Sequence, residues 1–96
     1  MRVIARARLR TFWEAHADAE EPLRRWFGEA ERADWTSPSD VRSQFATASF
    51  GSDRVVFNIG GNKYRLVVMI SYARHTVFIR FIGTHAAYDG VNVEEV

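Results

Sequence analysis

The chain has 96 residues, of which 47% are hydrophobic and 26% are charged, and it contains no cysteine. This size and composition predict one globular domain over residues 1–96, of the α+β class, with a single modest core. The lack of cysteine excludes disulfides and thiolate metal sites, and no segment has the roughly 18 consecutive apolar residues of a membrane span. We therefore expect a cytoplasmic protein that does not contact a membrane.

The charges are unevenly distributed, although the net charge is only +1. Residues 14–40 hold eight of the twelve carboxylates, whereas residues 41–83 hold one acid and six cations. These six cations are Arg42, Arg54, Lys63, Arg65, Arg74 and Arg80. Such asymmetry suggests a polyanionic partner, while the small total argues against a protein that simply coats nucleic acid. Codon bias could explain the excess of Arg over Lys, but not the nearly acid-free segment.

The N-terminal third predicts a strand followed by a helical hairpin. Residues 1–8 alternate in polarity and indicate a short strand near a sheet edge. Helical spacing of apolar residues then predicts a short helix over about residues 9–17. Asp18 and Glu21 have the spacing of a capping box for a second helix, whose stripe is Leu23, Trp26, Phe27 and Ala30. The two helices should pack on one face of a sheet.

The remaining chain predicts one more helix and a three-stranded meander. Ser37 followed by proline indicates a short helix ending near Phe45. Strands are expected at Arg54–Ile59, Lys63–Ser71 and Thr76–Ile82, with short turns that fit antiparallel pairing. The second strand is apolar on both faces and should be central. Gly83 is expected to end the third strand.

Several cations should meet at one end of this meander. The two-residue period of a strand places Lys63 and Arg65 on one face, and Arg80 on the face shared by Phe78 and Ile82. Because the second and third strands are antiparallel, the end of the third strand lies beside the start of the second. Cations that converge in this way repel one another unless an anion or nearby carboxylates offset their charge. A phosphate backbone is the natural anion.

The strand end carries groups that can transfer protons. Histidine exchanges a proton near neutral pH, so His85 is a candidate acid or base. One helical turn would bring Tyr88 beside it, and Asp89 could orient the imidazole. RNA can be cleaved without metal when its 2′-hydroxyl attacks the adjacent phosphate, which requires a base, an acid and cations. His85 and Tyr88 fit the first two roles, and the three cations fit the last.

Structural roles for the same residues remain open. Tyr88 could cover the sheet edge, Arg65 and Arg80 could pair with helix carboxylates, and Asn62 could form a turn. His85 could be structural, as we expect of His16 and His75. No residues have metal-ligand spacing and no phosphate-binding glycine loop is present, so we expect neither a metal nor a cofactor.

Five blocks of the sequence are similar to the HigB-type toxins of bacterial toxin–antitoxin pairs, a branch of the RelE-like mRNA interferases. The blocks are MRVIA, the helical pair FWEAH–DAEEPLRRWF taken as one block, ADWTSPSDVR, RVVFNIGGNKYRLVV and IRFIGTHAAYD. The resemblance implies a RelE-like α+β fold and a cytoplasmic endoribonuclease that cleaves mRNA, often on the ribosome. It also implies a HigA-type antitoxin with a helix-turn-helix domain. The toxin itself would contact operator DNA only indirectly, as part of a complex with this antitoxin.

The resemblance also implies roles for individual residues. Arg65 matches a strand-borne catalytic arginine, His85 a second catalytic base or cation, and Tyr88 a C-terminal catalytic tyrosine. We add Lys63 from its place beside Arg65, so either His85 or Lys63 could be the general base. Further RNA contacts are expected from Arg54, Asn62, Arg80, Thr84 and Asp89.

Two other functions use the same cations. A non-catalytic module that blocks translation by occupying RNA or the ribosome would need no proton-transfer groups. A co-repressor that has lost its toxicity would not stop cell growth when it is produced without its antitoxin.

Overall fold

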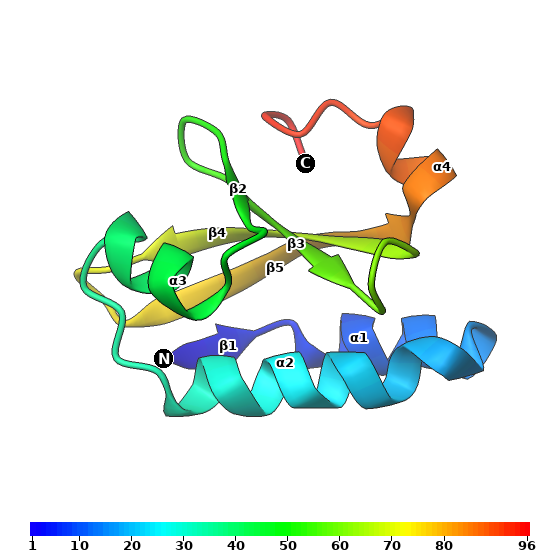
Figure 1. Cartoon of the computed structure of the whole chain (residues 1–96), viewed down its shortest axis with the longest axis horizontal. Coiled ribbons are helices and arrows are strands. Elements are labelled where there is room, and N and C mark those ends of the chain that lie inside the picture. The colour runs from blue at the N-terminus through cyan, green and yellow to red at the C-terminus, as the bar shows by residue number, and fades with distance from the viewer.

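A computed structural model describes residues 1–96 and contains a five-stranded sheet with its two long helices on one side (Figure 1). The elements are β1 (Arg2–Ile4), α1 (Arg6–Ala15), the 3-10 helix η1 (Ala17–Ala19), α2 (Glu20–Arg32), α3 (Pro38–Gln44), β2 (Ser49–Phe50), β3 (Val55–Ile59), β4 (Tyr64–Ser71), β5 (Thr76–Thr84) and α4 (His85–Asp89). The predicted α+β fold is confirmed. None of the helices has the length and apolar character needed to cross a bilayer.

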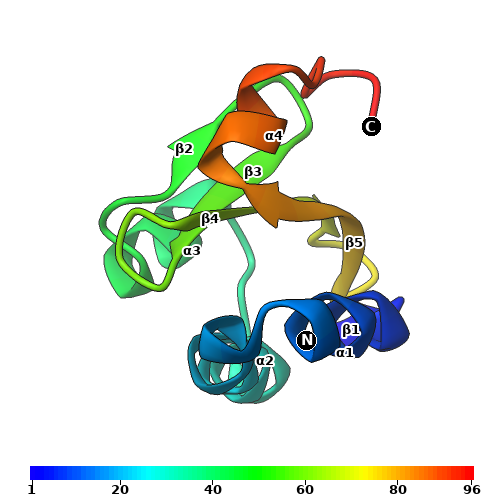
Figure 2. The ribbon, with the colours of Figure 1, turned by 90° about the vertical axis from the view of Figure 1, so that its right-hand side faces the viewer.

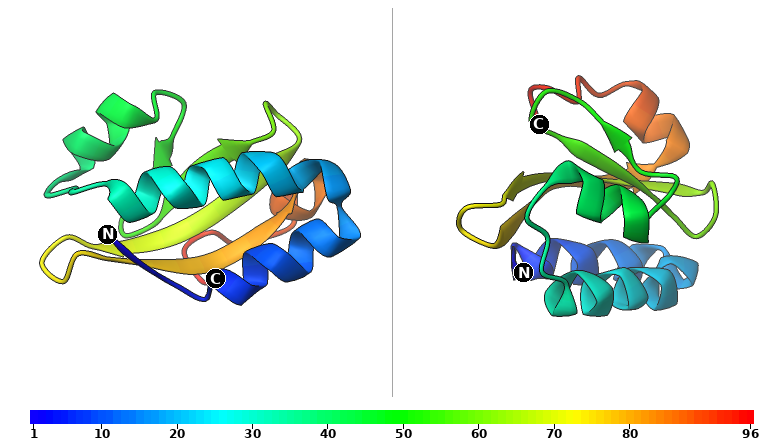
Figure 3. Two further views of the ribbon diagram at one scale, coloured as in Figure 1. Left: turned by 90° about the horizontal axis from the view of Figure 1, so that it is seen from below. Right: turned by 60° about the vertical axis from the view of Figure 1, so that its left-hand side comes forward.

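The strands are arranged in the order β1-β5-β4-β3-β2, with β1 parallel to β5 and all other neighbours antiparallel. Helices α1 and α2 lie across one face of the sheet, while α4 and the C-terminal segment lie on the other side (Figures 2 and 3). We call the side opposite α1 and α2 the open face. As predicted, the strand that is apolar on both faces, β4, is central.

The first strand is shorter than predicted. β1 ends at Ile4, because Ala5 adopts a left-handed conformation with φ 74° and α1 begins at Arg6. The prediction of a strand over residues 1–8 and a helix from Leu9 is therefore wrong at this boundary. Alternation of arginine with small apolar residues suits one turn of an amphipathic helix as well as a strand, so the period did not distinguish them.

The predicted capping box at Asp18 is also wrong. Asp18 lies in η1, and α2 begins without a side-chain cap. The helical stripe itself is confirmed, since Leu23, Trp26 and Ala30 are buried against the sheet. The carboxylate of Asp18 is used elsewhere, as described below.

A pair of glycines forms the turn between the first two strands of the meander. Gly60 and Gly61 have φ 62° and 70°, a conformation that a residue with a Cβ adopts only at a cost, so β3 can turn back directly into β4. The strand β5 continues through Gly83 to Thr84, which corrects the prediction that Gly83 ends it.

A bulge in β5 changes the side-chain alternation. Val67 pairs with Phe81 but Val68 pairs with Ile79, so Arg80 is the extra residue. Ile82 consequently packs against the helix-side core, and the prediction that Arg80 shares a face with both Phe78 and Ile82 is wrong.

The main core lies between the sheet and the helices. Phe57 is at its centre, in aromatic contact with Trp26, Trp35 and Phe45. Val67 is fully buried but does not belong to this core, because it points to the open face. Other parts of the chain therefore shield the middle of the open face from solvent, although no long helix packs on it.

Candidate functional site

The last residues of β5 pair with the first residues of β4. Arg65 is opposite Gly83, and the main-chain N–H of His85 donates to the carbonyl of Lys63 at 3.0 Å. The antiparallel return therefore places Lys63, Arg65 and His85 together at one end of the sheet. The short helix α4 follows β5 directly and therefore begins at the same end of the sheet (Figure 1).

Helix α4 holds a histidine–aspartate pair. His85 Nδ1 lies 3.3 Å from Asp89 Oδ2, one helical turn away, and both side chains are about half exposed. Thr84 caps the helix, because its Oγ1 accepts from the N–H of Ala87 at 3.1 Å. Tyr88 is half-buried. When Nδ1 donates to Asp89, the His85 Nε2 lone pair is free to accept a proton.

Arg65 is a buried cation without a carboxylate partner. Its residue is 9% exposed, and its guanidinium donates only to neutral oxygens. These are the carbonyls of Asn62 and Tyr64, at 3.3 and 3.2 Å, and the Asn62 side-chain oxygen at 2.7 Å. The alternative that Arg65 pairs with a helix carboxylate is therefore excluded, and Asn62 holds the guanidinium in place.

Lys63 is directed toward the helix side of the molecule. Its Nζ lies 2.7 Å from Asp18 Oδ2, and the hydroxyl of Tyr64 donates to the other oxygen of the same carboxylate. The hydrogen bond with Asp18 raises the pKa of Lys63, and hydrogen bonds from Lys63 and Tyr64 lower the pKa of Asp18. Lys63 is thus a firmly protonated ion-pair partner. Sequence reasoning missed this role of Asp18, since no local pattern signals a pair 45 residues apart.

Arg54 and Arg80 lie further along the sheet, away from α4. Arg54 precedes Val55, which pairs with Val68, and Arg80 is the bulge residue beside the same position. Both side chains donate to the main-chain oxygen of Val96. The structure therefore does not bring Arg80 into the His85 cluster, and Arg80 forms no ion pair with a helix carboxylate.

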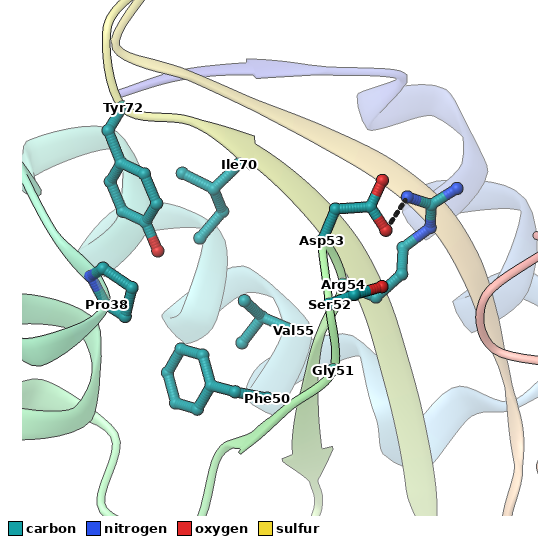
Figure 4. A pocket seen from close by; sticks show the side chains of 9 residues that line it. All are labelled: Pro38, Phe50, Gly51, Ser52, Asp53, Arg54, Val55, Ile70 and Tyr72. Atoms are coloured by element: carbon teal, nitrogen blue, oxygen red, sulfur yellow. Dashed lines mark ion pairs between the residues drawn. The ribbon is translucent and has the colours of Figure 1, made fainter.

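A separate cavity of about 180 Å³ lies at the opposite end of β4 (Figure 4). Its lining combines apolar and aromatic side chains, among them Phe50, Ile70 and Tyr72, with the turn residues 51–54. The Arg54 side chain turns away from it and pairs with Asp53. Burial raises the pKa of Tyr72.

Comparison with known proteins identifies the family. None of the curated proteins matches the chain. A family model described as HigB_toxin, RelE-like toxic component of a toxin-antitoxin system, matches residues 19–91. This range includes β3, β4, β5 and α4, and so contains Arg65, His85 and Tyr88. The chain therefore belongs to the HigB toxins, the RelE-like toxic components of toxin–antitoxin systems.

Proposed function

We propose that this toxin is an endoribonuclease that cleaves mRNA in the cytoplasm, without a metal, by attack of a 2′-hydroxyl on the adjacent phosphate. The observation that supports this best is Arg65, a buried guanidinium with no carboxylate partner, on the strand position that pairs with Gly83, two residues before the His85–Asp89 pair begins. Burying a charge without a counter-charge is costly, so such a group is suited to an anionic ligand. A phosphodiester supplies that anion.

The proposed reaction uses three side chains. His85 Nε2 accepts the proton of the 2′-hydroxyl, whose oxygen forms a bond to phosphorus. Tyr88 donates its proton to the departing 5′-oxygen as the P–O5′ bond breaks, leaving a 2′,3′-cyclic phosphate and a 5′-hydroxyl. Arg65 stabilises the charge that builds up on the phosphoryl oxygens.

Other residues support these three. Asp89 orients His85, Asn62 positions Arg65, and Thr84 caps the helix that carries the proton-transfer groups. Lys63 is a poor general base because it stays protonated in its ion pair with Asp18, and this favours His85.

The toxin family implies an antitoxin partner. We propose that this partner is of the HigA type, with a helix-turn-helix domain, and that the toxin approaches operator DNA only through it. We further propose that cleavage takes place on translated mRNA at the ribosome.

The experiment compares His85→Ala with His75→Ala after induction, while 5′ ends of mRNA are mapped. His75 is the matched control, because its Nδ1 also lies close to an aspartate, Asp34, at 3.1 Å. We expect new 5′ ends and growth arrest with the parent and His75→Ala, and neither with His85→Ala. Arrest with intact messages would instead indicate a module that acts by occupancy, and growth without antitoxin would indicate lost toxicity.

A further inference from the structure

The main-chain oxygen of Val96 is held by Arg54, which directly precedes β3, and by Arg80 in β5. Arg54 donates to it from Nε at 3.1 Å and from Nη2 at 2.7 Å, and Arg80 donates from Nε at 3.2 Å. Convergence of two guanidinium groups on one oxygen is the geometry in which arginines bind a phosphoryl oxygen. Here a main-chain oxygen occupies that position.

Arg54 is largely buried and is held by two partners. Its side chain is only 8% exposed, and its Nη1 lies 2.9 Å from Asp53 Oδ1, in an ion pair without hydrogen-bond geometry. Arg54 is therefore fixed in the orientation in which Nε and Nη2 point at the Val96 oxygen. Arg80 has no carboxylate side-chain partner and is exposed.

The segment that supplies this oxygen, Val91–Val96, is attached at a second point. The hydroxyl of Ser52, in the turn between β2 and β3, donates to Glu94 Oε2 at 2.5 Å. A Cβ at Gly51 would lie 2.5 Å from the other oxygen of Glu94, so the carboxylate occupies space that only glycine leaves free. The segment thus runs from α4 back over the open face to the β2–β3 turn (Figures 1 and 2).

We propose that Arg54 and Arg80 form a second phosphate subsite for the RNA strand, and that Val91–Val96 covers this subsite until RNA displaces it. The proposal rests on the proposed function, since it assigns RNA as the anion. Arg65 in β4 and Arg80 in β5 lie in one sheet, and Arg54 directly precedes its strand β3, so an RNA strand bound at Arg65 can continue toward the two other arginines.

A phosphodiester can replace the segment at the arginines. Both guanidinium groups now share one oxygen of Val96, whereas a phosphodiester has two charged oxygens that an arginine can bind in the bidentate manner. Opposing this, RNA must break the contact between Ser52 and Glu94 and approach the carboxylates of the segment. The segment therefore lowers the affinity for RNA without blocking the subsite permanently.

The test measures binding of a fluorescent 2′-O-methyl RNA oligonucleotide, which cannot be cleaved, to the full-length protein. Glu94→Ala removes the contact with Ser52, and Gly51→Ala displaces the Glu94 carboxylate without changing the charge. Both variants should bind about two- to fivefold more tightly, the range that one exposed charged contact corresponds to. Arg54→Gln combined with Glu94→Ala should remove this gain.

Glu95→Ala is the control for charge alone, because the Glu95 side chain makes no hydrogen bond or ion pair. Equal gains for Glu94→Ala and Glu95→Ala, with none for Gly51→Ala, would overturn the proposal. So would a gain that persists with Arg54→Gln. Cleavage of ordinary RNA is measured in parallel, and its absence together with the expected binding pattern would refute only the proposed catalysis.

Discussion

At the scale of single residues, the environment of Arg65 matters more than its position. A surface arginine on a strand is usually solvated, whereas Arg65 is buried and is held by oxygens that carry no charge. The protein therefore maintains a buried positive charge that no carboxylate of the chain offsets. This makes the residue beside it, Asn62, a sensitive point for substitution.

Asn62→Asp should weaken RNA binding more than Asn62→Ala. The new carboxylate would lie where Asn62 Oδ1 now accepts from Arg65 at 2.7 Å, and would neutralise the guanidinium. We expect Asn62→Asp to raise the melting temperature while it lowers affinity for the 2′-O-methyl RNA about tenfold, equivalent to about 1.4 kcal/mol. Anisotropy titrations at low salt provide the measurement, and equal affinity for the two variants would contradict this role of Arg65.

At the scale of elements, α4 is a weak support for the residues that it carries. It has five residues, no buried side chain and one side-chain cap. Isolated helices of this length are unstable, so the cap and the contacts with β5 must hold it.

Thr84→Ala should reduce cleavage while leaving the global stability nearly unchanged. Loss of the hydrogen bond from Ala87 to Thr84 costs about 1 kcal/mol, which is local to α4. Thr84→Ser keeps the hydroxyl and should cleave like the parent. Cleavage rates and thermal melts of the three proteins test this, and a rate for Thr84→Ala equal to that of Thr84→Ser would show that the cap is dispensable.

The ion pair between η1 and the start of β4 should make stability depend on pH. The pKa of Asp18 is lowered by folding, so its contribution is present above its ordinary value of 3.8 and is lost as the pH falls through the lower folded value. The pKa of Lys63 is raised, so its contribution is present below 10.5 and is lost at more alkaline pH.

Asp18→Asn should therefore melt at a lower temperature than the parent at pH 7, and the difference should shrink in strongly acidic solution. Glu14→Gln removes an acid from the same helical region that makes no ion pair, and serves as the control. A difference between Asp18→Asn and the parent that stays constant down to the acid transition would argue against this ion pair.

At the scale of the whole molecule, one aromatic residue joins the sheet to the helices. Phe57 is 1% exposed and contacts rings from α2, the loop after it, and the end of α3. Phe57→Ala should destabilise the fold by about 3–5 kcal/mol, a large share of the roughly 5–15 kcal/mol that such domains have. Phe57→Leu should cost much less. Urea unfolding measures both, and similar losses would mean that the cavity is not what determines the cost.

The periodicity of the chain was sufficient for most of the fold. The strands β3, β4 and β5 and the helix α2 were predictable, because each depends on a pattern of neighbouring residues. These patterns are the strands with one or two apolar faces, the glycine turn and the stripe of Leu23, Trp26 and Ala30. The bulge at Arg80 was not, because it depends on pairing with β4 rather than on the composition of β5.

The candidate site was predictable where it depends on the return of β5 along β4, which brings His85 to Lys63 and Arg65. It was not predictable where distant segments contribute. The pairing of Lys63 with Asp18 and the capture of Val96 by Arg54 and Arg80 join residues with no common local pattern.

The extra residue in β5 has no partner on β4, so the strand does not need it for its pairing. Because Val67 already pairs with Phe81 and Val68 with Ile79, deleting Arg80 would close the bulge and leave Thr76–Ile79 in register with β4 and β1. Val77 and Ile79 would therefore keep their interior positions, and the deletion would remove only the guanidinium that contacts Val96. Natural relatives should therefore tolerate the loss of one residue at this point of the strand.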